Sequence, residues 1–130
     1  MSEEPDRTAA YEFVLEHVDS VPHLEALLLL WNTRPREWPV VEVAQRLYVT
    51  IDVARTILQD LCRQQLVTCS SEDEQHYSYT SLSEEQNRIL QSVDQTYRVE
   101  IVPISTMIHS KASRAVRDFA RAFRFTKDRE

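Results

Sequence analysis

Hydrophobic positions recur at helical spacing along most of the chain. Apolar residues between Val40 and Leu47 fall at positions i, i+3, i+4 and i+7, which predicts an amphipathic helix. Tyr48 and Val49 interrupt this pattern. A second apolar stripe follows Thr50, a good N-cap, and ends near Gln65. The pattern therefore predicts two short helices separated by a turn.

Residues 20–32 place apolar side chains on nearly every side of a predicted helix. Asp19 or Ser20 can cap this helix, and Pro22 falls in its first turn, where a missing backbone donor costs little. We expect the helix to run to about Asn32 and to be buried all round, with a subunit interface supplying part of the cover. Residues 8–18 fit both a helix and a strand, and the helix is the preferred interpretation.

The pattern changes after residue 65 and predicts a β-hairpin followed by a helical tail. Residues 66–69 and 76–80 are β-prone arms around a polar tip. Ser83, with Gln86 three residues later, makes a capping box for a long helix whose apolar stripe extends to Ile101. Pro103 must kink or restart that helix. Residues 113–125 place alanine, valine and phenylalanine on one side of a last helix.

Length and composition are those of one folded domain. The chain has 130 residues, of which 42% are hydrophobic and 28% charged, enough for a self-sufficient core. Its longest apolar run, from Ala26 to Trp31, is far shorter than the roughly 20 residues that a membrane span needs. The acidic first residues do not resemble a secretory signal. We therefore expect a cytoplasmic protein without a membrane partner.

The chain contains no glycine. Phosphate-cradling loops and dinucleotide-binding turns need backbone conformations that only glycine adopts readily, so we expect no nucleotide partner. The same absence predicts wide turns, or turns built on Asn, Asp or Ser, because other residues resist positive φ.

No local motif supplies a nucleophile with its base or a pair of catalytic carboxylates, so the chain is not expected to be an enzyme. Cys62 and Cys69 have no companion histidines at zinc-finger spacing, and we expect reduced thiols in or near the core. The four histidines are scattered without helical pairing. We predict neither a metal nor a cofactor.

The order of the elements carries a resemblance. The run from Trp38 to Thr50 has a small residue, Ala44, where two helices would cross, and a leucine stripe and Leu66-Val67 follow it. Over residues 20–80 this pattern resembles the winged helix-turn-helix domains of bacterial transcription regulators. The later run Phe119-Ala-Arg-Ala-Phe123 is similar to the end of a group of small bacterial winged-helix proteins.

The fold that this resemblance implies is mainly α, with a small β hairpin and a C-terminal helical extension. It divides the chain into an N-terminal segment (1–19), a winged helix-turn-helix core (20–80) and a helical tail (81–130) that packs on the core or on a second subunit. We expect a homodimer that uses the apolar faces of residues 24–31 and 82–125.

The resemblance also implies a function, in which the helix after the turn enters the major groove of DNA and the hairpin lies along the phosphates. The polar face of residues 50–65 presents side chains that can read base edges, and a solvated helix face is the alternative of equal weight. The prediction is a non-catalytic DNA-binding transcription regulator. Its candidate DNA contacts are Arg55, Thr56, Gln59 and Arg63.

The charge distribution supports a second hypothesis. The net charge is −6, and an acidic wing would repel the DNA backbone. The chain could instead be a protein-protein interaction module that uses its wing or its recognition face. The acidic wing residues are Glu72, Asp73 and Glu74.

A basic stripe near the end of the chain consists of Arg114, Arg117, Arg121 and Arg124. These arginines could contact phosphate, pair with the acidic N-terminal segment of the same or a neighbouring subunit, or be solvated. The two ends of the chain are therefore electrically opposite.

Overall fold

A computed structural model describes residues 4–70 and 76–112. It confirms the predicted mainly α fold with a small hairpin, and residues 8–17 are helical, as preferred. A further helix covers residues 101–112. The preceding elements, in chain order, are α1 (Arg7–His17), α2 (Val21–Thr33), β1 (Trp38–Pro39), α3 (Val40–Leu47), α4 (Ile51–Arg63), β2 (Thr68–Cys69), β3 (His76–Ser78) and α5 (Glu84–Val99).

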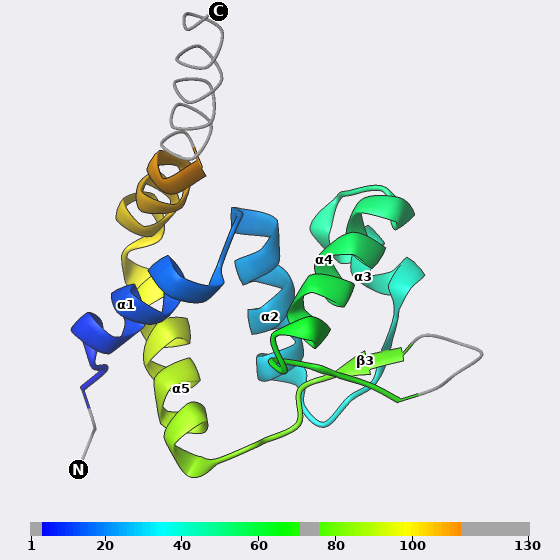
Figure 1. The fold of residues 1–130 in the computed structure, drawn as a ribbon, viewed down its shortest axis with the longest axis horizontal. Helices are drawn as coiled ribbons and strands as arrows, with labels where there is room; N and C mark the ends of the chain where they lie inside the picture. The colour runs from blue at the N-terminus through cyan, green and yellow to red at the C-terminus, as the bar shows by residue number, and fades with distance from the viewer. Residues whose placement is uncertain (1–3, 71–75, 113–130) are drawn as a thin grey trace, which may run out of the picture.

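Helix α2 lies in the middle of the molecule (Figure 1). On one side are α3, α4 and an antiparallel sheet of order β1-β3-β2, in which Tyr77 pairs with Trp38 on one edge and Cys69 on the other. On the other side α1 packs against α5. Within the described ranges, no helix is both long and apolar enough to cross a membrane.

Polar caps set where the helices begin. Ser20, Thr50 and Ser83 each accept a hydrogen bond from the backbone N–H three residues later, which satisfies one of the free donors of a helix start. At the end of α5, Pro103 lies in the first turn of the next helix, so it restarts the helix rather than bending it. Ile101 belongs to that next helix and is 51% exposed, so the predicted α5 stripe ends before it.

The expectation that turns avoid positive φ outside Asn, Asp and Ser is wrong at two positions. Tyr48 after α3 and Gln65 after α4 have φ values of 57° and 62°. In each case the N–H of the next residue donates to a carbonyl of the preceding helix, at 3.1 Å and 3.0 Å respectively. These bonds satisfy carbonyls that a helix end leaves free and offset the cost of the left-handed residue. A tight turn without glycine therefore joins α3 to α4.

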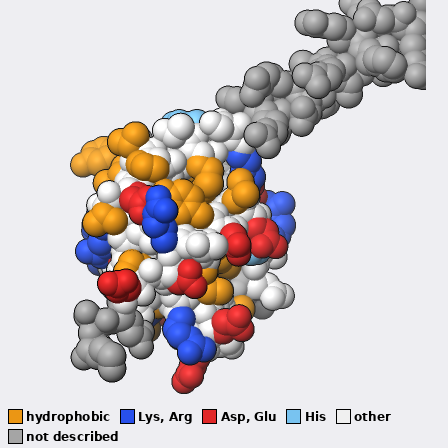
Figure 2. Space-filling model, turned by 90° about the vertical axis from the view of Figure 1, so that its left-hand side faces the viewer, with side chains coloured by type: hydrophobic (Ala, Val, Ile, Leu, Met, Phe, Trp, Pro, Cys, Tyr) orange, Lys and Arg blue, Asp and Glu red, His pale blue; other side chains and the backbone are white. Residues whose placement is uncertain are grey.

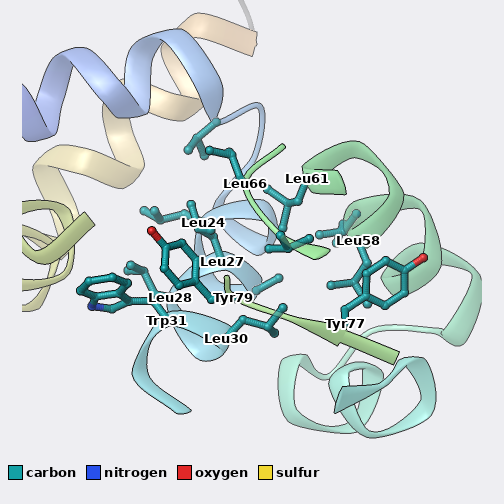
Figure 3. Close-up of a cluster of buried hydrophobic side chains, with 14 of the residues drawn as sticks. Leu24, Leu27, Leu28, Leu30, Trp31, Leu58, Leu61, Leu66, Tyr77 and Tyr79 are labelled. Carbon is teal, nitrogen blue, oxygen red and sulfur yellow. The ribbon is translucent and has the colours of Figure 1, made fainter. Parts of the chain in front are cut away.

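The hydrophobic core surrounds α2, and Figure 3 shows its leucines facing side chains of α4 and the wing. The rings of Trp31 and Tyr79 meet edge to face, with centroids 5.1 Å apart. Burial of α2 is extensive but not all round: Leu24, Leu27 and Leu30 are fully covered, whereas Glu25 and Asn32 are exposed. The cover comes from α3, α4, α5 and β3 of the same chain. Burial of these leucines therefore does not require a subunit interface, and pairing of two subunits through α2 stays a prediction.

Candidate nucleic-acid interface

Helix α4 has one apolar and one polar face. Ala54, Ile57, Leu58 and Leu61 are buried against the core. Because a helix turns about 100° per residue, this burial directs the remaining positions outward. The structure accordingly exposes all four of the candidate contacts on one helix: Arg55, Thr56, Gln59 and Arg63.

Neighbouring carboxylates partner both arginines of α4. Arg55 Nη1 donates to Asp52 Oδ1 at 3.0 Å, and the Asp52 side chain is 93% exposed. Arg63 Nη2 donates to Asp60 one turn further on. Both pairs leave the helix face without net charge. Since exposed ion pairs contribute little free energy, about 0–1 kcal/mol, a phosphate or a guanine can compete for these guanidinium groups.

The Asp60 pair is anchored from a second helix, unlike the Asp52 pair. Asp60 Oδ2 lies 2.9 Å from His23 Nε2, and the Nδ1 of the same ring lies 2.6 Å from Ser20 Oγ. His23 is largely buried, with 13% of its side chain exposed. A hydrogen-bonded chain thus runs from the first turn of α2 through Asp60 to Arg63. The partner of Arg63 is therefore held in place by a second helix, whereas among the described residues Asp52, the partner of Arg55, has no hydrogen bond or ion pair to another helix.

The end of α4 is tied to α1 as well. Gln64 Nε2 donates to the His17 carbonyl at 2.9 Å, and Gln64 Oε1 lies 2.9 Å from His17 Nδ1. Together with the His23 contact, this arrangement fixes the last turn of α4 to the α1–α2 junction. No local sequence pattern predicts these contacts, because the partners are 37 and 47 residues apart.

Three further arginines stack on the two tryptophans near the sheet. Arg34 lies 3.6 Å from the ring centroid of Trp31, while Arg36 and Arg46 lie 3.8 Å and 5.4 Å from that of Trp38. Cation–π contacts of this kind order the guanidinium groups, and Arg36 Nη2 also donates to Glu42 Oε1 at 3.0 Å. No local sequence pattern predicts this group, because the stacking depends on how the loop after α2 and helix α3 fold against the tryptophans.

Buried tyrosines surround the base of the wing. Burial raises the pKa of Tyr77 above its ordinary value, and the neighbouring Cys69 and Cys62 raise it further. Burial likewise raises the pKa of Tyr79. Both phenols therefore stay protonated at neutral pH and act as core side chains with a polar end. Cys62 and Cys69 are partly buried, as expected.

Other predicted features lie outside the described residues: the acidic wing (Glu72, Asp73 and Glu74) and the basic stripe (Arg114, Arg117, Arg121 and Arg124). Within the described part of the chain, no group of three or more His, Cys, Asp or Glu side chains is placed to hold a metal ion.

The elements described above form a winged helix-turn-helix. It consists of α3, the tight turn at Tyr48, α4 and the β2–β3 wing, with β1 completing the sheet.

The chain is similar to the transcriptional regulator Tm0710 from Thermotoga maritima, with 12% identity and a TM-score of 0.53 over 94% of this chain and 85% of that one. It is also similar to MepR, a transcription regulator from Staphylococcus aureus, with 11% identity and a TM-score of 0.53 over 92% of this chain and 89% of that one.

A third similar structure is a homodimeric winged helix-turn-helix DNA-binding domain from Mycobacterium bovis. It has 23% identity and a TM-score of 0.52, over 77% of this chain and 94% of that domain. At these identities the likeness confirms the winged helix-turn-helix fold. No protein-family model matches the sequence, and no curated protein matches it.

Proposed function

We propose that this protein is a non-catalytic, DNA-binding transcription regulator that places α4 in the major groove. The observation that carries the proposal is the exposed face of α4, with Arg55, Thr56, Gln59 and Arg63 on the helix that follows the turn. An arginine fork matches a guanine edge, and a glutamine amide matches an adenine edge. The regulators and the DNA-binding domain among the similar structures support this function.

Because ion pairs neutralise the helix face, we expect modest affinity for random DNA and a larger share of sequence-dependent contacts. Arg34 and Arg46, which stack on the tryptophans, provide further positive charge near the sheet, whereas Arg36 is paired with Glu42 at 3.0 Å. The alternative of a protein-interaction module depends on the acidic wing, Glu72 to Glu74, which is outside the described residues. The regulator is therefore the function that the described surface supports better.

We also propose that the regulator is a homodimer that pairs through the tail. Val99, Ile101 and Val102, at the break after α5, are 79%, 51% and 73% exposed. Figure 2 views the side of the molecule formed by α1 and α5 and shows hydrophobic side chains gathered in its upper part among charged ones. Two-fold pairing there would present two copies of α4 to one duplex.

Fluorescence anisotropy tests DNA binding directly. A labelled random duplex is titrated with the protein at about 50 and 200 mM salt, where phosphate contacts weaken steeply. We expect salt-sensitive binding that both Arg55→Ala and Arg63→Ala reduce. The matched control is Arg88→Ala, which removes the same charge from an exposed position on α5 and should bind as the wild type does. No binding at the lower salt concentration would refute the proposal.

Light scattering on a sizing column tests self-association. The wild type should elute as a dimer, and the double variant Val99→Asp/Val102→Asp as a monomer, because two carboxylates cannot be buried in an apolar contact. Val41→Asp, at a 47% exposed position on α3, should remain dimeric. A dimeric double variant would refute the proposed interface and leave the DNA-binding proposal standing.

A further inference from the structure

The turn and the first residues of α4 expose bulky apolar side chains where polar ones are usual. Ile51 and Val53 are 43% and 45% exposed, and Tyr48 just before them is 95% exposed. Single exposed apolar residues need no explanation. Here, however, two β-branched side chains occupy the first turn of the helix that the proposed function places in DNA, and β-branched residues are not favoured there for helix stability.

Ile51 and Val53 flank the polar stripe of α4. They are two residues apart, which places them about 200° apart around the helix axis. Asp52 projects between them, in line with Thr56 and Gln59. Neither apolar side chain can therefore join the buried stripe fully, and the two border the polar stripe on opposite sides at the N-terminal end of α4.

We propose that Ile51 and Val53 recognise thymine through its 5-methyl group when α4 binds in the major groove. The inference rests on the proposed function and adds a base preference to it. The methyl group of thymine is the apolar feature of the major-groove edge, and aliphatic side chains distinguish it from the hydrogen at the same position of cytosine. The N-terminal residues of a recognition helix are those that reach base edges.

The ion pair of Asp52 with Arg55 lies beside these two apolar side chains. The Asp52 carboxylate holds Arg55 at 3.0 Å, so the arginine fork extends from the same first turn as the two apolar side chains. A guanine bound by Arg55 would then have thymines as near neighbours. The chemistry of the first turn thus specifies a short mixed sequence rather than a run of one base.

The test begins by selecting bound duplexes from a random DNA pool with the full-length protein. Each thymine of the selected site is then replaced by deoxyuridine, which removes only the methyl group. Burying one methyl-sized group corresponds to about a fourfold change in affinity. We expect a loss of about this size at one or two thymines near the guanine contacted by Arg55, and none at the others.

Protein variants assign the methyl contacts to side chains. Ile51→Ala and Val53→Ala should each abolish the thymine-to-uracil difference at one position while keeping the deoxyuridine affinity of the wild type. Val41→Ala removes an equally exposed valine from α3 and should keep both differences. Thermal unfolding followed by circular dichroism identifies any variant that has lost its fold, and Ile51→Ser and Val53→Ser, which carry no methyl group, then replace the alanine variants.

The outcomes separate the two proposals. Equal binding of thymine and deoxyuridine duplexes at every position would overturn the methyl contact and leave DNA binding intact. Alanine variants that weaken both duplexes equally would also overturn it, because the side chains would then act only on the fold of α4. A complete lack of DNA binding would remove the proposed function, and this inference with it.

Discussion

Arg7 and Glu100 form a two-pronged ion pair that joins the first turn of α1 to the break after α5. Arg7 Nε lies 2.6 Å from Glu100 Oε2, and Arg7 Nη2 lies 2.7 Å from Oε1. The Tyr11 hydroxyl donates to the same carboxylate at 2.7 Å. Glu100 is the residue between α5 and the next helix. The three contacts therefore hold α1 across the point where the helix direction changes.

This arrangement predicts an acid-sensitive stability. Hydrogen bonds from Arg7 and Tyr11 lower the pKa of Glu100 from its ordinary value of 4.5. A carboxylate whose pKa is lowered by folding stabilises the folded state above its ordinary pKa, and this contribution is lost as the pH falls through the lowered value. Glu100→Gln should therefore be less stable than the wild type at neutral pH, and the difference should shrink below pH 4.5.

Urea unfolding of both proteins at about pH 7 and about pH 3 checks this. Arg7→Met should show the same convergence, because it removes the other partner of the pair. A difference between wild type and Glu100→Gln that stays constant across this range would show that the carboxylate contributes through shape rather than charge.

Thr96 carries a buried hydroxyl that has no hydrogen-bond partner among the described residues. The residue is 1% exposed and faces the core from α5. Leaving such a group unpaired costs about 1–3 kcal/mol. Thr96→Val replaces the hydroxyl with a methyl group of similar size, so we expect the free energy of unfolding to rise by about 1 kcal/mol. Thr96→Ser, which keeps the hydroxyl and removes the methyl group, should lower it. Urea titration measures both, and a less stable Thr96→Val would contradict the prediction.

The left-handed conformation of Tyr48 predicts that glycine stabilises the turn between α3 and α4. For a residue with a Cβ atom this conformation costs about 1–2 kcal/mol, and glycine avoids the cost but loses about 0.4–1 kcal/mol through the unfolded chain. Because the tyrosine side chain is 95% exposed, little packing is lost. Tyr48→Gly should therefore raise the free energy of unfolding by about 0.5–1 kcal/mol. Tyr48→Ala keeps the strain and serves as the control, with thermal unfolding as the measurement.

Most helices could be predicted from sequence because each one rests on local signals. The apolar spacing of residues 40–47, for example, matches α3, and Thr50 caps α4 as expected. The sheet strand at Trp38–Pro39 was missed because two residues hold no periodicity and the strand exists only through its pairing with β3. The turn after residue 47 and the helix end near Gln65 were predicted, but the left-handed conformations of Tyr48 and Gln65 were not, because backbone hydrogen bonds to the preceding helix rather than residue preference fix them.

The candidate interface was predictable only in part. The apolar stripe of α4 specifies which residues are exposed, so Arg55 and Arg63 could be placed on its outer face. The contacts of these arginines and of their carboxylates differ in how far apart they lie along the chain. Asp52 and Asp60 are each three residues from their arginine and follow from helix spacing. The contact of His23 with Asp60 joins residues 37 positions apart, and no local pattern indicates it.

The pairing of Asp52 with Arg55 leads to a prediction about DNA affinity. Asp52 is 93% exposed and places a negative charge on the face proposed to meet DNA. Asp52→Asn removes that charge and frees Arg55, so we expect affinity for random duplex DNA to rise about tenfold at low salt and the salt dependence to steepen by about one phosphate contact. Anisotropy titrations across a salt series measure both. Glu84→Gln makes the same charge change on α5 and should have a much smaller effect. If the two variants gain affinity equally, the change reflects net charge alone, and α4 would not be the surface that meets the duplex.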